Sequence, residues 1–346
     1  MPHQDPFKLN DTLVPAGSRM IVDLPISALS NRLPMSLPVQ VIHGRRPGPT
    51  MFVSAAVHGD EIIGVEILRR LMKRPALDRL KGTLMLIPVV NGYGFLNHSR
   101  YLPDRRDLNR CFPGSATGSL AHRLSNMFLE QVVKRADYGI DLHSAAIHRS
   151  NLPQIRIHEG DATLMDLARA FGAQVVLTSS LRDGSLRESA SQMGVPVMLF
   201  EGGEGLRFDE HAIRAGVAGI LRVMAHVGMI DQTSATPARH APYVSNASSW
   251  VRAPAGGILR LSVSLGGMVK KGDVVGALND LFGEQEQTLT APADGIVIGQ
   301  TNLPVVNEGD AVLHIAEPAR RKTAKEKKQE ATRPPQPALA YEDEII

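Results

Sequence analysis

Between residues 50 and 226 the sequence alternates short apolar stretches with segments of helical periodicity. The apolar stretches span 50–57, 82–90, 138–142, 175–177 and 195–200, and the helical segments span 61–73, 120–135, 161–171, 185–193 and 209–226. Strands this uniformly apolar are buried on both faces, which is typical of parallel strands covered by helices. The alternation therefore predicts an α/β fold with a mixed, mainly parallel sheet flanked by helices.

The sequence after about residue 240 changes to short β segments separated by Gly, Pro and Asn, and two of its passages resemble each other. Residues 252–259 and 267–276 form the first passage, and residues 290–297 and 304–312 form the second. An internal duplication of this kind indicates an all-β unit with two related halves. Its Ala-Pro-x-x-Gly and Gly-Asp signatures resemble the biotinyl/lipoyl-like barrel. The turn at 279–284 lacks the lysine that a covalent carrier needs, so we expect a structural or substrate-shielding domain.

Composition excludes several classes of protein. The single cysteine, Cys111, excludes an internal disulfide framework and any all-cysteine metal site, and it suits a reducing compartment. No run of roughly 18 apolar residues occurs, which argues against a transmembrane helix. Residues 1–13 lack the basic-then-apolar shape of a signal peptide. We therefore expect a cytoplasmic protein with no membrane partner.

Charge is concentrated at the C-terminal end of the chain. The formal net charge is only +3, and residues 319–333 carry a cluster of Lys and Arg that is followed by a Pro-rich stretch and an acidic end. The rest of the chain is near neutrality, and aromatic residues make up 4% of the sequence. Nucleic-acid platforms interleave basic and aromatic residues, so we expect a solvated tail and no nucleic-acid partner.

Polar residues with metal-binding chemistry follow two of the predicted strands. His58 ends the apolar stretch 50–57, and Glu61 follows three residues later as a helix begins; His143 ends the stretch 138–142. Ligands bind outside the carboxyl ends of strands in open α/β sheets. Two His and one Glu suit catalytic zinc, because three protein ligands leave a place for water. We therefore expect one zinc ion per chain. Without His143, the simplest interpretation of His58 and Glu61 would be a polar strand end, with Glu61 favouring the start of the helix.

Two further segments carry groups suited to catalysis or recognition. Glu201 ends the apolar stretch 195–200, where desolvation suits a general base; its alternatives are a strand-end charge that faces water, or Glu204 as the base. Residues 99–114 are rich in arginine, whose guanidinium group binds carboxylates in bidentate fashion, although such loops are often simply solvated.

Four ordered motifs resemble the succinylglutamate desuccinylase/aspartoacylase family, a branch of the zinc carboxypeptidase superfamily. They are His58-x-x-Glu61, Asp107-Leu-Asn109-Arg110, Asp141-Leu-His143 and Phe200-Glu201-Gly. The resemblance covers about residues 20–316. It implies a zinc carboxypeptidase-like fold in which His58, Glu61 and His143 hold zinc and Glu201 is the general base.

The same resemblance implies roles for the polar loop residues. Asn109 and Arg110 match the pair that grips the substrate α-carboxylate. Arg100 matches the arginine that polarises the scissile carbonyl, with Arg105 as the alternative. Asp107 matches the carboxylate that orients a histidine ligand. Arg187 is a candidate to reach a second substrate carboxylate.

The implied activity is that of a zinc-dependent amidohydrolase. It would deacylate an N-acyl amino acid of acetyl or succinyl type to a carboxylate and a free amine. A metallocarboxypeptidase acting on a peptide or an amide-linked glutamate, and a non-catalytic binding protein with the same fold, are the alternatives. The partner would be a small-molecule substrate, and a homo-oligomer is possible.

These features divide the chain into four predicted parts. Residues 1–18 form an N-terminal segment, 19–235 the zinc-dependent catalytic domain, 240–317 the C-terminal β-domain with its internal duplication, and 318–346 a disordered charged tail.

Overall fold

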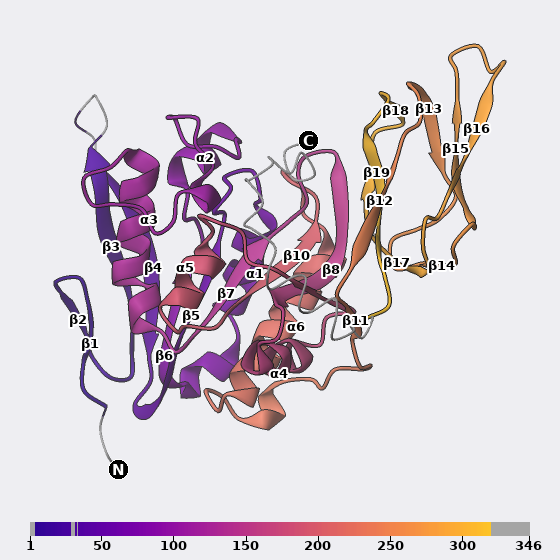
Figure 1. Cartoon of the computed structure of the whole chain (residues 1–346). Coiled ribbons are helices and arrows are strands. Elements are labelled where there is room, and N and C mark those ends of the chain that lie inside the picture. Colours follow the sequence, from indigo (N-terminus) through magenta and orange to yellow (C-terminus); the bar gives the residue numbers. More distant parts are fainter. Residues whose placement is uncertain (1–3, 29–31, 33, 320–346) are drawn as a thin grey trace, which may run out of the picture.

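The computed structural model describes residues 4–28, 32 and 34–319 (Figure 1). Nearly all of the predicted tail, from residue 320 onward, lies outside these residues. The described chain builds a thirteen-stranded sheet, a four-stranded sheet and a two-stranded hairpin. Among the described residues, the structure has no helix with the length and apolar character that crossing a membrane requires.

The described chain begins with five strands, mixes strands and helices up to residue 226, and has only strands from residue 243 to residue 316. The strands are β1 (Phe7–Leu9), β2 (Thr12–Val14), β3 (Ser18–Ala28), β4 (Pro34–His43), β5 (Arg46–Ala55), β6 (Lys81–Ile87), β7 (Tyr138–His143), β8 (Arg149–His158), β9 (Val175–Ser179), β10 (Val197–Gly203), β11 (Tyr243–Ser245), β12 (Ser248–Arg252), β13 (Gly257–Leu261), β14 (Met268–Val269), β15 (Val274–Asn279), β16 (Glu286–Thr290), β17 (Gly295–Thr301), β18 (Val305–Val306) and β19 (Ala311–Ala316). The helices are α1 (Ile63–Leu71), α2 (Gly92–Asn97), α3 (Leu120–Gln131), α4 (Ala162–Phe171), α5 (Leu186–Gln192) and α6 (Glu210–His226). Short 3₁₀ turns lie at Pro75–Arg79, Leu108–Arg110, Val133–Arg135 and Gln232–Ser234.

The large sheet is mixed and has a parallel centre. Its main path runs β12-β19-β17-β8-β10-β7-β5-β6-β4-β3, with β9 paired to β8, β11 paired to β9 and β14 paired to β17. The strands β10, β7, β5 and β6 are parallel neighbours, whereas β8 on one side and β4 on the other are antiparallel to them. The predicted α/β class is thus confirmed. Since β5, β7 and β10 are parallel, their carboxyl ends lie at one edge of the sheet.

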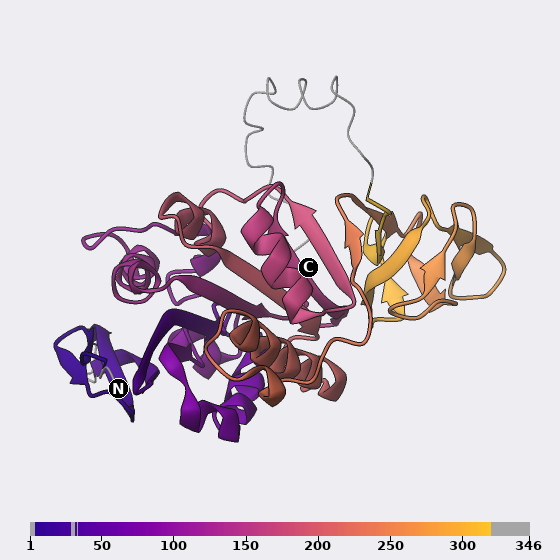
Figure 2. The same ribbon diagram turned by 90° about the horizontal axis from the view of Figure 1, so that it is seen from below.

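Helices cover both faces of this sheet, each over its own apolar core (Figures 1 and 2). Ile67 of α1, Phe171 of α4 and Ile220 of α6 belong to one buried cluster. Phe128 of α3 and Leu186 of α5 belong to the other. The helices are amphipathic, with apolar residues at helical spacing facing the sheet.

Most helix starts follow from capping side chains. Ser119, Asp161, Ser185 and Asp209 precede α3, α4, α5 and α6, and each accepts a hydrogen bond from a backbone N–H three residues further on. Such caps satisfy N–H groups that have no partner within the helix. The structure therefore begins these helices within a residue of the predicted positions.

The two similar C-terminal passages pair reciprocally. Strand β13 of the first passage pairs with β18 of the second, and β17 of the second pairs with β14 of the first. In the same way β12 pairs with β19, and β16 pairs with β15. Equivalent positions of the two passages, such as Leu259 and Val297, are buried in one cluster. Neither passage therefore has a complete set of strand partners without the other.

The C-terminal strands are divided between the central sheet and a smaller sheet. Strand β17 pairs with β8, from Gly299 opposite Asn151 to Thr301 opposite Arg149, so the second passage continues the central sheet. Only β13, β15, β16 and β18 make up the four-stranded antiparallel sheet. Figure 1 shows these strands extending from the β8 end of the molecule. The predicted separate barrel is not confirmed, and the predicted domain limits stay predictions.

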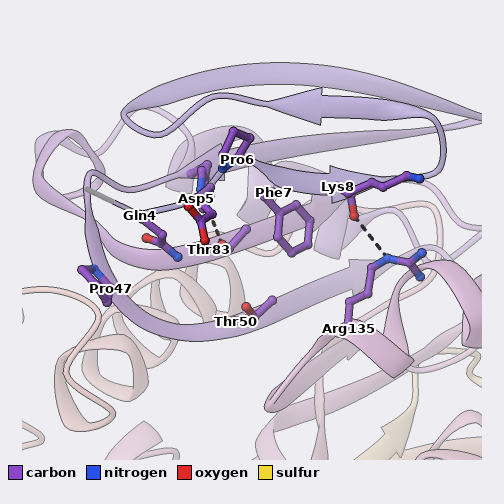
Figure 3. Close-up of a pocket in the computed structure, with 10 residues that line it drawn as sticks. Gln4, Asp5, Pro6, Phe7, Lys8, Pro47, Thr50, Thr83 and Arg135 are labelled. Atoms are coloured by element: carbon purple, nitrogen blue, oxygen red, sulfur yellow. Dashed lines mark hydrogen bonds between the residues drawn. The ribbon is translucent and has the colours of Figure 1, made fainter. Parts of the chain in front are cut away.

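A cavity of about 580 Å³ lies between the N-terminal segment and the amino-terminal halves of β5 and β6 (Figure 3). Buried His43 joins its walls, because Nε2–H donates to the Asp5 carbonyl at 2.8 Å and Nδ1 accepts from the Thr83 hydroxyl at 2.9 Å. Arg135 donates to the Lys8 carbonyl at 3.3 Å. These contacts anchor the N-terminal segment at the sheet edge opposite the carboxyl ends of β5 and β7.

Candidate metal centre

The turn after β5 places His58 and Glu61 beside each other. Ala56 adopts a left-handed conformation with φ of 50°, which turns the chain out of the strand. Gly59 follows His58, and a Cβ at this position would overlap the backbone of Gly94 in α2. Only glycine therefore fits, and its contact with α2 fixes the turn from which Glu61 leads into α1.

His143 reaches the same place from the end of β7. Strand β7 is parallel to β5, and Ala55 lies opposite Leu142, so His143, the last residue of β7, lies at the same edge of the sheet as the turn that carries His58. Nδ1 of His58 lies 2.6 Å from Oε1 of Glu61, and Nδ1 of His143 lies 2.8 Å from Oε2 of the same carboxylate. One ligand atom from each residue lies within 4.8 Å of the others. The three side chains, which are 2–3% exposed, thus converge as the sequence predicts.

A carboxylate holds the outer nitrogen of each histidine. Nε2 of His58 lies 3.1 Å from Asp107, and Nε2 of His143 lies 2.7 Å from Asp141. Ser54 donates to the other oxygen of Asp141 at 2.7 Å. Histidines that ligate metals in proteins have such partners, which fix the ring orientation and raise ligand basicity. Asp107 therefore lies where the resemblance implies, and Asp141 plays the matching part for His143.

The charges of the cluster are strongly coupled. Burial raises the pKa of Glu61, but His58 and His143 outweigh burial and hold it far below its ordinary value. Burial lowers the pKa of His143, but Asp141 and Glu61 outweigh burial and raise it well above its ordinary value. Burial and then Arg100 lower the pKa of His58, yet its neighbouring carboxylates leave it raised. The carboxylates of the cluster thus favour positive charge on both imidazoles.

The donor set fits zinc. Two imidazole nitrogens and one carboxylate oxygen face one another, and the outer atoms of both rings are already engaged. Zinc binds neutral imidazole and carboxylate in this combination. Binding would release the protons that the imidazoles carry.

Arg100 joins the cluster, and Arg105 does not. The Arg100 guanidinium donates to Asp107 at 2.8 Å through Nη2 and to Glu61 at 3.4 Å through Nη1. The amide of Asn91, which also caps α2, donates to the Arg100 carbonyl at 3.3 Å. Arg105 is exposed on the loop. Of the two candidates for polarising a carbonyl, the structure brings only Arg100 to the site.

Asn109 and Arg110 lie in a 3₁₀ turn that contacts the first turn of α5, where Arg187 lies. The N–H of Asn109 donates to Asp107 at 2.8 Å, and the Asn109 side-chain oxygen accepts from the Leu186 N–H at 2.9 Å. Arg187 is the next residue, in the first turn of α5 and partly buried. Arg110 is exposed and donates to the Asn109 carbonyl at 2.8 Å. These candidate substrate residues are thus connected to the metal cluster through Asp107.

Glu201 lies one strand away from His143. The two residues are in register on the parallel strands β10 and β7. Oε2 of Glu201 accepts from the Asn151 amide at 2.9 Å, and Oε1 lies 3.9 Å from Nε of Arg156. Its rival Glu204 instead accepts from the His148 N–H and from the Asn302 amide, where β17 meets β8. The geometry therefore favours Glu201 as the carboxylate of the site.

Asp141, Asn151 and Arg156 also contact residues of the site, and the sequence predicts no role for them. Asp141 had a visible signal, because residues two apart on a strand share a face and it lies two before His143. Asn151 and Arg156 have no such signal in the sequence, because their place beside Glu201 depends on how β8 pairs with β10.

Comparisons with known proteins agree with this geometry. The succinylglutamate desuccinylase/aspartoacylase catalytic domain matches residues 47–227. The N-alpha-acetyl-L-2,4-diaminobutyric acid deacetylase of Halomonas elongata is 28% identical over 293 residues, which cover 81% of this chain and 85% of that protein.

Solved structures share the fold over most of the chain. A succinylglutamate desuccinylase/aspartoacylase from Rhodobacter sphaeroides has a TM-score of 0.75 and 26% identity, covering 87% of this chain and 95% of that one. The product-bound ectoine utilization protein EutE (DoeB) from Ruegeria pomeroyi has a TM-score of 0.77 and 23% identity, covering 91% and 99%. The likeness thus extends beyond the matched domain.

Proposed function

This chain belongs to the succinylglutamate desuccinylase/aspartoacylase family, and on that premise we propose that it is a zinc-dependent deacylase of a small N-acyl amino acid. It is a hydrolase of carbon–nitrogen bonds in amides, as its relatives are. The observation that carries the proposal is the convergence of His58, Glu61 and His143, with Glu201 in register with His143 on the neighbouring strand.

His58, Glu61 and His143 would hold the zinc ion, the histidines through Nδ1. A bound zinc ion lowers the pKa of water to about 7 and polarises an amide carbonyl. Asp107 and Asp141 keep both imidazoles turned toward the ion.

The remaining steps belong to the side chains of the protein. Glu201 takes the proton of the attacking water and passes it to the leaving amine, which cannot depart as an amide anion. Asp107 holds Arg100 through Nη2 and Nε, so Nη1 remains beside Glu61 to donate to the oxygen on which negative charge develops. Asn109 and Arg110 bind the substrate carboxylate.

The substrate is an acetylated or succinylated amino acid. The deacetylase of Halomonas elongata acts on an acetylated diamino acid, which supports a small acyl group here. In this proposal the C-terminal strands shield the site. Their paired halves keep a biotinyl/lipoyl-like arrangement, and residues 279–284 contain no lysine to which a carrier group could be attached. Shielding would favour a small substrate over a peptide.

A hydrolysis screen tests the proposal. Purified protein would be assayed for release of free amine from a panel of N-acetyl and N-succinyl amino acids, with zinc content measured by elemental analysis. We expect turnover of a subset of the panel, its loss with a chelator and its return with added zinc. Cleavage of C-terminal glutamate from peptides alone would identify a carboxypeptidase, and bound zinc without any hydrolysis would identify a binding protein.

A further inference from the structure

The carboxylate of Glu201 is held by a side chain that the C-terminal strands support. The Asn151 amide donates to Oε2 of Glu201 at 2.9 Å. Asn151 lies on β8 between two glycines, opposite Gly203 of β10 on one side and opposite Gly299 of β17 on the other. The residue that contacts the proposed base therefore lies at the junction of the central sheet with β17.

Gly299 leaves the space that Asn151 occupies. A Cβ at Gly299 would lie 2.9 Å from Oδ1 of Asn151 and 3.3 Å from the Cβ of His314. A carbon–oxygen distance of 2.9 Å is too short for a nonbonded contact, so one of the two atoms would have to shift. Any side chain at this position would displace the amide that donates to Glu201.

The same row of residues continues across the C-terminal strands. His314 of β19 lies opposite Gly299, and Trp250 of β12 lies opposite His314. The two rings are stacked with centroids 4.1 Å apart and planes within 8°, and the Arg149 guanidinium lies 5.4 Å from the centre of the Trp250 ring. Stacked rings and a cation over an aromatic face stabilise this arrangement. The row gives β17 a fixed position against β8.

We propose that Asn151 is a positioning residue for Glu201 and that β17 holds it in place through the side-chain-free position at Gly299. This inference rests on the proposed function. Arg156 supplies charge near Oε1, whereas the Asn151 amide fixes the direction of Oε2. The C-terminal strands thereby contribute to catalysis by supporting the base, besides covering the site.

The first test removes the amide. In Asn151→Ala we expect kcat to fall roughly 10- to 100-fold with KM within about twofold of the wild type, because the lost hydrogen bond acts on a charged group that reacts. In Asn151→Asp we expect a larger fall in kcat, since a second carboxylate repels Glu201. Zinc content should equal that of the wild type in both.

The second test changes β17 and leaves Asn151 intact. We expect Gly299→Ala to lower kcat severalfold and to shift the fluorescence of Trp250, the only tryptophan in the chain, since its stacked partner His314 must move. The matched control is Gly256→Ala, where a Cβ would meet its nearest atom at 3.6 Å, an ordinary contact. The control should keep wild-type kcat and fluorescence.

Crystal structures of the wild type and Asn151→Ala give a readout independent of turnover. We expect the Glu201 carboxylate to leave its wild-type position in the variant. Glu201 held in place, or a variant kcat within twofold of the wild type, would overturn the inference. If the wild type hydrolyses no member of the substrate panel, the proposed function fails, and the position of Glu201 in the variant still decides this inference.

Discussion

His58 and His143 each turn Nδ1 toward Glu61 and Nε2 toward an aspartate. The strand-end positions of these residues predict that they meet, because parallel strands finish at one edge. Which ring nitrogen faces Glu61 does not follow from the sequence, because it depends on the side chain that contacts the other nitrogen of each ring. For His143 that side chain is Asp141, with Ser54 behind it on the neighbouring strand.

Asp141→Asn is expected to weaken zinc binding about 10- to 100-fold while His58, Glu61 and His143 remain. The amide would lower the basicity of the His143 ring and free its orientation. Competition with a chromophoric chelator measures the affinity. Asp11→Asn, at an exposed position, is the control, and equal affinities in the two variants would contradict the role given to Asp141.

Glu201→Gln is expected to retain bound zinc and to lose essentially all turnover, at least about 10²-fold, because the amide cannot accept the proton of water. Zinc analysis and kcat on the best substrate of the panel measure both properties. Glu204→Gln, which alters the rival carboxylate, should keep most of the activity. The opposite ranking would transfer the role of base to Glu204.

The loops of the site could be predicted only in part. The arginine-rich segment predicts carboxylate recognition, but Arg100 and Arg105 could not be separated by composition. The structure separates them through contacts made by distant residues, namely Asp107 and the amide of Asn91. Such contacts depend on the path of the loop, which carries no periodic pattern.

Among the elements, the helices were the most predictable and the polar strands the least. Helices α3 to α6 combine capping residues with apolar periodicity, so both their type and their starts follow from the sequence. Strand β8 has no apolar run, since Asn151, Gln154 and Arg156 interrupt it, so no sequence pattern predicts it. Prolines at 25 and 38 similarly obscure β3 and β4.

Helices α1 and α6 are linked by a charged cluster around Glu66. Arg69 and Arg70 both bond Glu66, and Arg70 also bonds Glu210 of α6. The hydrogen bond from Arg69, followed by that from Arg70, lowers the pKa of Glu66 to about 2 against an ordinary 4.5, although burial opposes the shift. A depressed carboxylate pKa contributes stability above the unfolded value, and this contribution disappears as pH falls through the folded value.

Glu66→Gln is therefore expected to lower Tm by a few degrees at pH 7, with the difference shrinking between about pH 4.5 and pH 2. Thermal melts of both proteins across this range measure the effect. Solvent around the partly exposed arginines screens the cluster and keeps the effect small. A Tm difference that is constant with pH would show that the carboxylate charge is not its cause.

At the scale of the whole molecule, the duplication was visible in the sequence and its three-dimensional arrangement was not. The repeated Ala-Pro and Gly-Asp motifs predict two related halves. Their reciprocal pairing depends on registers between different segments, and the junction of β17 with β8 joins segments about 150 residues apart. Single-sequence periodicity encodes neither.

A chain that ends after residue 242 is expected to keep all three candidate zinc ligands and yet to lose most of its activity. Its β8 edge would lose β17, and the cluster containing Leu152, Val175 and Leu177 would lose Ile296 and Ile298. Exposed edges of this kind promote association. Size-exclusion chromatography, zinc analysis and kcat measure the outcome. A chain ending at residue 319 is the control, and wild-type activity in the shorter chain would contradict the expectation.

The reciprocal pairing of the C-terminal halves also determines when each strand can find its partner during synthesis on the ribosome. Strands β12 and β13 are synthesised first but obtain β19 and β18 only when the last described residues have been made. Asn151 waits more than twice as long for Gly299, which follows it by about 150 residues. At about 5–20 residues per second on the ribosome, that interval lasts many seconds. A nascent chain paused before β17 therefore lacks the strand that lies against Asn151, even where His58, Glu61 and His143 have already come together.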